Sequence, residues 1–158
     1  MKKTVIAAAI AAALVLGSAS PAGAAPTKAP VSFSFTAPIN LLEDCCFVGI
    51  GLEPTTVTLP RIGRATVSGS IEWCGSSPYS PCPERAGTTL SLSFATPSGA
   101  TLTLGGHTPI DEQTLTWAVT GGTGRFAGAS GSGSYTYDLV FTPTALLATV
   151  QVTGTLHA

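Results

Sequence analysis

The chain has 158 residues, only 9% of which are charged, and its formal net charge at pH 7 is −1. Its Lys and Arg residues are scattered, which excludes the clustered basic surface that a nucleic-acid-binding protein needs to contact phosphates. The length suits one domain that buries its own core without a structural metal, and with so few charges its surface has to be made polar by Ser and Thr.

The first residues are typical of a secretory signal peptide. Lys2 and Lys3 give a positive start, an apolar run extends from Val5 to Leu16, and Ala22-Gly23-Ala24 is a small-residue cleavage site. We therefore expect residues 1–24 to be a Sec-type signal peptide, residues 25–30 to be a Pro/Ala linker, and residues 31–158 to be a single β-barrel domain.

Cleavage after Ala24 determines the charge and the compartment of the mature chain. It removes two of the seven basic residues and none of the eight acidic ones, which leaves a net charge near −3. The apolar run is shorter than the ~20 residues of a membrane-spanning helix, and no comparable run follows it. We expect a secreted, extracellular protein without a membrane anchor, and the Ala-, Gly- and Thr-rich composition indicates a bacterial one.

In the rest of the chain, apolar side chains recur at every second position, which predicts β-strands with one buried face. The opposite positions are mostly Ser and Thr, which a water-facing pleat tolerates. In chain order, the alternating sets are Val31, Phe33 and Phe35; Val57 and Leu59; Val67, Ile71 and Trp73; Leu90, Leu92 and Phe94; Leu102 and Leu104; Leu115, Trp117 and Val119; Tyr135, Tyr137, Leu139 and Phe141; and Val150, Val152 and Leu156.

Turn-forming residues separate these sets, at residues 60–63, 75–83, 97–99, 105–109, 121–124 and 142–144. Roughly eight short strands with short connections predict antiparallel hairpins, because parallel strands need crossovers of about a dozen residues. The predicted fold class is all-β, an antiparallel eight-stranded barrel of the calycin-like type, with a two-sheet β-sandwich as the alternative. Such a barrel is filled by side chains or holds one small ligand.

The four cysteines Cys45, Cys46, Cys74 and Cys82 of an exported chain are most simply two disulfides. A bond between the adjacent Cys45 and Cys46 would need a strained ring, so we expect each of them to pair with Cys74 or Cys82. The Cys-Cys dipeptide lacks the ligand spacing of structural zinc sites, and no Cys-x-x-Cys redox motif is present. We therefore expect no metal and no cofactor.

A glycine-rich segment contains Gly122-Thr123-Gly124-Arg125-Phe126-Ala127, which matches the dinucleotide fingerprint G-x-G-x-x-A by its letters. That fingerprint binds a pyrophosphate at the N-terminus of a following helix, whereas here a strand pattern follows. The segment instead predicts a tight hairpin or bulge in which glycines adopt positive φ.

The same segment resembles a family motif, a Gly-Gly-Thr-Gly-x-Phe turn followed by small residues. This motif is shared by plant dirigent proteins, allene oxide cyclases and bacterial secreted proteins with the allene-oxide-cyclase-like barrel. The resemblance implies an eight-stranded antiparallel barrel with a central apolar cavity, which the plant members use to hold reactive hydrophobic intermediates and impose stereochemistry. The matching positions are Gly121, Gly122, Thr123, Gly124, Phe126, Ala129 and Gly131.

The ionisable residues offer little catalytic chemistry. His107 and Asp111 share a loop, but no G-x-S-x-G elbow accompanies them. Glu72 and Asp138 are offset by one position from the apolar sets of their strands, so both should face solvent rather than form the facing pair of a glycosidase. We lean towards a protein that is not an enzyme, and a dirigent- or cyclase-like enzyme is an alternative implied by the resemblance alone.

Aromatic side chains are the better candidates for binding, although core packing is their simpler role. Trp117, Tyr135 and Tyr137 carry polar atoms that need partners when buried, which makes them the candidate lining of a ligand cavity. Arg125 either holds an anion at the barrel mouth or bonds local carbonyls or Asp138 as a hairpin-tip residue. The leading hypothesis is a secreted, non-catalytic barrel that binds a small hydrophobic ligand.

The loop from Cys74 to Cys82 suggests a second class of function. Two prolines and a disulfide anchor at either end would present Tyr79 in a preorganised loop, which lowers the entropy lost on binding a protein. An extracellular protein partner, as for a protein-interaction or protease-inhibitor module, is therefore the alternative to the small ligand. The same residues also fit a long hairpin connection without a partner.

Overall fold

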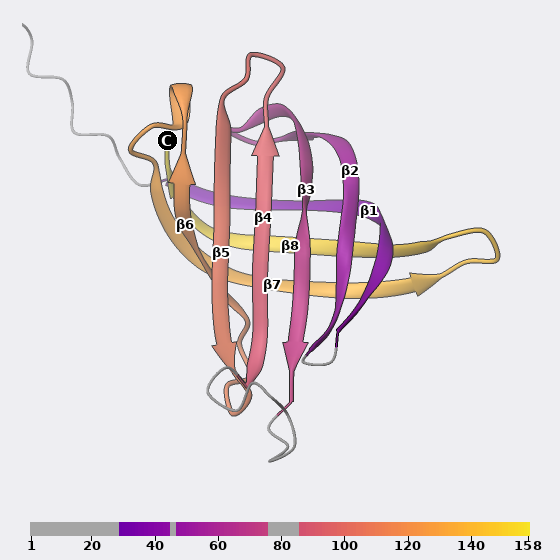
Figure 1. Ribbon diagram of the computed structural model, residues 1–158. Helices are drawn as coiled ribbons and strands as arrows, with labels where there is room; N and C mark the ends of the chain where they lie inside the picture. Colours follow the sequence, from indigo (N-terminus) through magenta and orange to yellow (C-terminus); the bar gives the residue numbers. More distant parts are fainter. Residues whose placement is uncertain (1–28, 45–46, 76–85) are drawn as a thin grey trace, which may run out of the picture.

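The computed structural model describes residues 29–44, 47–75 and 86–158. Within them, eight antiparallel strands close into one barrel in chain order (Figure 1). The one helical element of this part of the chain is the 3-10 turn η2, and no described helix is long and apolar enough to cross a membrane. The elements are β1 (Ala29–Asp44), β2 (Phe47–Leu59), β3 (Gly63–Cys74), β4 (Gly87–Ala95), β5 (Thr101–Pro109), β6 (Thr116–Gly122), η2 (Gly124–Phe126), β7 (Ser130–Phe141) and β8 (Leu146–His157).

The closed barrel confirms the predicted fold class, and the two-sheet sandwich is wrong. Several other predictions concern residues outside the described ranges, so the structure leaves them as predictions. These are the signal peptide at residues 1–24, the linker up to residue 28, the Tyr79 loop, and the pairing of Cys45, Cys46 and Cys82.

The break predicted at residues 105–109 is wrong, because β5 runs through both glycines to Pro109. A Cβ atom at Gly106 would collide with the carbonyl oxygen of Thr116, where β6 begins. The glycine therefore permits a close approach of two strands rather than ending one. The first two strands are also longer than their alternation predicts, since β1 and β2 remain paired from Ile39 with Leu52 to Asp44 with Phe47.

The glycine-rich segment joins β6 to β7 as an antiparallel pair, which confirms the predicted hairpin. Positive φ is found at Gly124 (+58°), the first residue of the 3-10 turn, and at Gly128 (+79°), just after the turn. A register shift in the pairing of β5 with β6, between Thr103 and Leu104, adds a bulge just before the segment.

The barrel interior is filled by the inward positions of all eight strands. At its centre, the Phe94 ring makes edge-on contacts with Phe33 and Phe35, at centroid distances of 6.0 and 6.3 Å. Such aromatic pairs add about 0.5–1.5 kcal/mol each to the stabilisation from burial. The middle of the barrel is therefore packed core rather than a cavity.

One end of the barrel is closed by residues from its connections. Ile62 from the β2–β3 turn, Ala100 from the β4–β5 turn and Phe126 from η2 are all buried there. Arg125 lies beside them, with its guanidinium carbon 4.6 Å from the centroid of the Phe126 ring, and donates a hydrogen bond to the carbonyl oxygen of Ile62. These contacts join two connections and plug this end.

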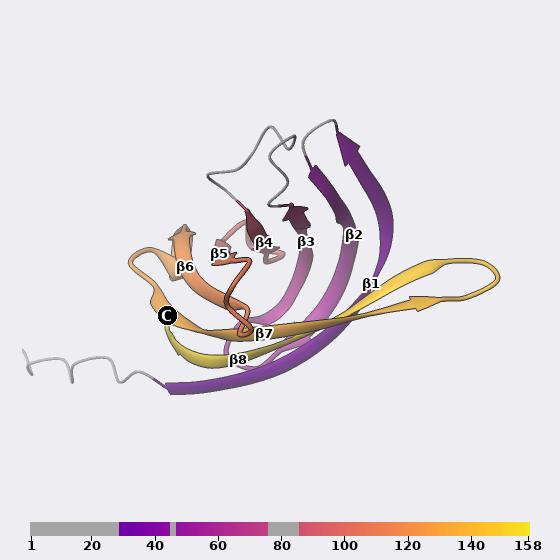
Figure 2. The same ribbon diagram turned by 90° about the horizontal axis from the view of Figure 1, so that it is seen from below.

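At the opposite end, where β1, β3, β5 and β7 finish, no residue of the described connections is buried in this way, and we call it the open end (Figure 2). The large apolar side chains that the described residues expose all lie there: Leu41, Val48, Ile110, Leu139, Val140 and Phe141. The alternation of β7 predicts buried side chains at Leu139 and Phe141, but they are 36% and 72% exposed. Both residues lie in a hairpin, formed by β7 and β8, that extends beyond the barrel (Figure 2).

Candidate functional site

Two aromatic side chains span the open end of the barrel. Nε1 of Trp73 on β3 donates a hydrogen bond of 2.6 Å to the hydroxyl of Tyr137 on β7, and the ring centroids are 5.7 Å apart. Because β3 and β7 are not neighbours in the barrel, this pair crosses the mouth. One hollow is lined by Tyr137 and another by Trp73.

The larger hollow, of about 480 Å³, lies where β6 and β7 separate. These strands pair only from Thr116 to Ala118, and a further hydrogen bond joins the Tyr135 amide to the carbonyl of Leu115. The volume falls within the ~300–1,000 Å³ of typical small-molecule pockets. Its lining consists of Gln113, Thr114, Leu115, Ser134, Tyr135, Thr136 and Tyr137, and none of these is charged at neutral pH.

Tyr135, one of the lining residues, also carries a buried polar atom. The residue is only 2% exposed, and its hydroxyl has no hydrogen-bond partner anywhere in the described part of the chain. Burial raises the pKa of Tyr135 well above its usual value, with a smaller contribution from Tyr137. Burial also raises the pKa of Tyr137, although the hydrogen bond from Trp73 partly offsets this effect. Both hydroxyls are therefore protonated at neutral pH and available as donors.

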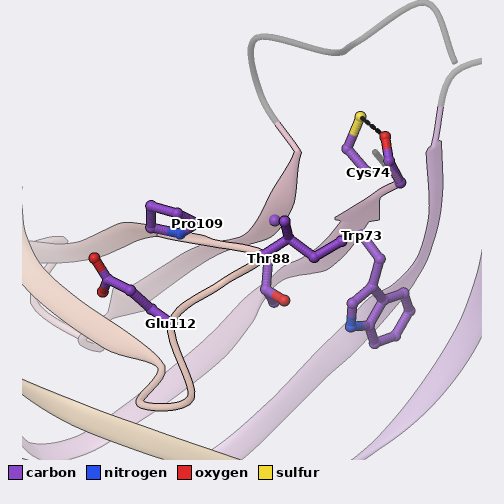
Figure 3. A pocket seen from close by; sticks show the side chains of 8 residues that line it. Trp73, Cys74, Thr88, Pro109 and Glu112 are labelled. Carbon is purple, nitrogen blue, oxygen red and sulfur yellow. Dashed lines mark hydrogen bonds between the residues drawn. The ribbon is translucent and has the colours of Figure 1, made fainter. Parts of the chain in front are cut away.

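The smaller hollow lies on the other side of Trp73, between the end of β3 and the loop after β5 (Figure 3). Its volume of about 220 Å³ is below the range of typical ligand pockets. Glu112 contributes the one carboxylate among its described lining residues, from the loop opposite Trp73. The Cys74 sulfur lies here too, 4.0 Å from the carbonyl oxygen of Gly75.

The structure brings together two of the four predicted lining residues, Tyr135 and Tyr137. Trp117 is 3% exposed and its indole N–H is bonded to two backbone carbonyls, of Ser134 at 3.1 Å and Thr153 at 3.0 Å. Trp117 is therefore a core residue whose polar atom has its hydrogen-bond partners, and it does not line the hollow. Arg125 lies at the closed end, where it bonds a carbonyl that is distant in the sequence rather than a local one or Asp138.

Trp73 and Leu115 are not among the residues that the sequence predicts for the site. Trp73 stands among the aromatic residues of the alternating pattern, so its inward direction is predictable from Ile71 two positions before it. Its partner is not predictable, because Tyr137 is 64 positions away and meets it only when the barrel closes.

The ionisable residues lie away from the interior. Asp138 is exposed, and Glu72 lies on the outer face, where it accepts a 2.8 Å hydrogen bond from Ser70. His107 is exposed, with its Nδ1 atom 3.1 Å from the hydroxyl of Thr89, and Asp111 is exposed as well. Among the described residues, the buried side chains include no carboxylate, imidazole or basic group, and no cluster of metal ligands is found there.

Comparison with known proteins yields a structural likeness only. No protein-family model matches the chain, and no curated protein sequence matches it. Among solved structures, the fold is similar to that of the pterocarpan synthase dirigent protein GePTS1. That similarity has a TM-score of 0.47 and a sequence identity of 14%, over 83% of this chain and 86% of the other.

Proposed function

We propose that the protein is a secreted, non-catalytic barrel that binds one small hydrophobic ligand in the larger hollow of its open end. The observation that carries this proposal is the unpartnered hydroxyl of Tyr135. A buried hydroxyl without a partner costs about 1–3 kcal/mol, and native interiors rarely contain one. A ligand atom that bonds this hydroxyl removes that cost.

The lining also limits the chemistry of the ligand. The aromatic rings of Tyr135 and Tyr137 and the side chain of Leu115 provide apolar contact, and no charged group of the hollow would neutralise an ionic ligand. The best-suited molecule is uncharged and mostly apolar, with one oxygen or nitrogen placed to bond Tyr135. Export is supported by the leader-like residues 1–24, and the glycine motif supports a relation to the dirigent-like barrels.

Binding rather than catalysis is supported by the position of the ionisable groups. General acid–base catalysis needs a carboxylate, imidazole or amine within about 3 Å of the reacting atom. The buried side chains of the described residues contain none of these groups, and the tyrosine hydroxyls have raised pKa values that make them poor bases at neutral pH.

A matched pair of probes tests the proposal. Equilibrium dialysis compares 2-naphthol with naphthalene, which differ by one hydroxyl, on the wild-type protein and on Tyr135→Phe. We expect 2-naphthol to bind the wild type about tenfold more tightly, because a hydrogen bond to an otherwise unpaired buried hydroxyl is worth about 1–2 kcal/mol. We expect the two probes to bind Tyr135→Phe equally.

Tyr79→Ala is the control variant, because cavity binding should not respond to a change in the 74–82 loop. The absence of saturable binding of either probe would refute the proposal. So would an unchanged preference for 2-naphthol in Tyr135→Phe. A loss of binding in Tyr79→Ala would direct attention to that loop instead.

A further inference from the structure

Among the described residues, the second half of β7 has a strand edge without a partner. β7 pairs with β8 along its whole length, from Ser130 to Phe141, but with β6 only from Ser132 to Ser134. After the single bond from the Tyr135 amide, no described residue is hydrogen-bonded to the other edge of β7. An unpaired edge of this kind is a template for another strand.

The backbone direction on this edge follows from one hydrogen bond. The Tyr135 amide donates to Leu115, away from β8, and in an antiparallel strand every second residue directs its N–H and C=O to the same side. Tyr137, Leu139 and Phe141 therefore present their N–H and C=O groups to the free edge. The same three side chains point to the inner side of the sheet.

This edge is also apolar and accessible. Leu139, Val140 and Phe141 are 36%, 47% and 72% exposed, and the hairpin that carries them extends away from the rest of the barrel (Figure 2). Natural edge strands are commonly protected by Lys, Pro or a bulge. Residues 136–141 contain neither Lys nor Pro, and their pairing with β8 is regular.

We propose that two copies of the chain associate through this edge, with β7 of one copy antiparallel to β7 of the other and Leu139 opposite its own counterpart. Residues that pair across a sheet point to the same face, so odd-numbered positions of β7 must pair with odd-numbered ones. The twofold axis must then pass through a residue rather than between two residues. An axis at Leu139 places Tyr137 opposite the partner's Phe141.

Charge and hydrogen bonding select this register over its neighbours. An axis at Asp138 would place two carboxylates directly opposite, which is destabilising in a sheet. An axis at Val140 would leave the N–H and C=O groups of Tyr137 without a strand partner. The axis at Leu139 keeps each Asp138 opposite a valine. It also gives the free-edge N–H and C=O groups of Tyr137, Leu139 and Phe141 a hydrogen-bonded partner. The segment thus complements a second copy of itself.

The association would also complete the wall of the larger hollow. Tyr137 lines that hollow, and the partner's Phe141 would lie across from it on the same face of the joined sheet. A pair of short strands buries less than the roughly 1,200 Å² of a standard stable interface, so the dimer should dissociate on dilution. The association needs no ligand, and its test is independent of the binding proposal.

Sedimentation equilibrium of the purified protein from about 1 μM to 1 mM tests the inference through charge complementation. We expect a monomer–dimer equilibrium for the wild type, and at least a tenfold weaker association for Leu139→Lys and for Leu139→Glu alone. An equimolar mixture of the two variants should restore the dimer, because position 139 faces itself across the axis. Leu41→Lys is the matched control, since Leu41 is 61% exposed at the same end of the barrel but lies on β1.

Circular dichroism of each variant checks that the barrel has formed. Phe141→Ser provides a second, independent change at the more exposed position, and it should weaken the dimer in the same way. A monomer at every concentration would overturn the inference. So would a dimer that survives both Leu139→Lys and Phe141→Ser, a mixture that fails to restore association, or an assembly larger than a dimer.

Discussion

The hydroxyl of Tyr135 allows a sharp test through Tyr135→Phe, a change that removes one oxygen atom and keeps the ring. In most proteins a buried tyrosine hydroxyl is hydrogen-bonded, so its removal lowers stability by about 1 kcal/mol. Here the hydroxyl has no partner among the described residues, so its removal should relieve a desolvation penalty. We expect the free energy of unfolding to rise by about 1 kcal/mol and the melting temperature by about 3–4 °C.

Tyr137→Phe is the matched control, since it removes the same atom from the neighbouring inward position of the same strand. Its hydroxyl accepts a 2.6 Å hydrogen bond from Nε1 of Trp73, which would lose its partner. We expect the free energy of unfolding to fall by about 1 kcal/mol. The two tyrosine-to-phenylalanine changes should therefore shift stability in opposite directions.

Urea denaturation, followed by circular dichroism, measures both effects as shifts in the midpoint at an unchanged slope. A saturating concentration of 2-naphthol should reverse the order of wild type and Tyr135→Phe, because only the wild type gains the hydrogen bond to the ligand. If Tyr135→Phe lost as much stability as Tyr137→Phe without ligand, the hydroxyl would have a partner and the argument for the site would fail.

Two further predictions concern alkaline pH and the closed end. Burial raises the pKa of the Tyr135 hydroxyl in the folded protein, so on raising the pH the unfolded chain loses this proton first, near pH 10. The free energy of unfolding should therefore be constant below that pH and fall above it by up to about 1.4 kcal/mol per pH unit. Urea midpoints from pH 8 to 11 measure this decline, and an identical decline in Tyr135→Phe would contradict the assignment. Arg125→Ala removes the hydrogen bond to Ile62 and the contact with the Phe126 ring, so we expect a loss of about 1 kcal/mol or less in thermal unfolding and an unchanged affinity for 2-naphthol. A large loss of affinity would place Arg125 in the binding site after all.

The alternation of apolar residues was enough to predict the strands and their inward faces, because side-chain direction in a strand depends only on position. Phe33, Phe35 and Phe94 are buried as this rule requires. The rule does not indicate where a strand leaves the barrel. Phe141 has the same parity as Tyr135 and yet is exposed, since the β7–β8 hairpin is longer than the wall that it completes.

In the candidate site too, the sequence predicts the direction of a side chain but not its hydrogen-bond partner. Tyr135, Tyr137 and Trp117 were predicted as inward aromatic residues, and all three point into the barrel. They differ in their hydrogen bonds, which form only when the barrel closes. Trp117 donates to a carbonyl of β8 and Tyr137 accepts from the indole of Trp73 on β3, whereas the hydroxyl of Tyr135 has no partner among the described residues.

The requirements on the glycine-rich segment come from the closed end of the barrel and not from the candidate site. Gly124 adopts a φ of +58°, which favours glycine, and η2 then directs Phe126 into the barrel beside Ile62. A side chain at Gly122 would collide with the Phe126 carbonyl, so the turn has to be small where it crosses the end of the barrel. The motif thus specifies a plug. The candidate site at the open end, where Tyr135 and Tyr137 lie, is formed by other residues.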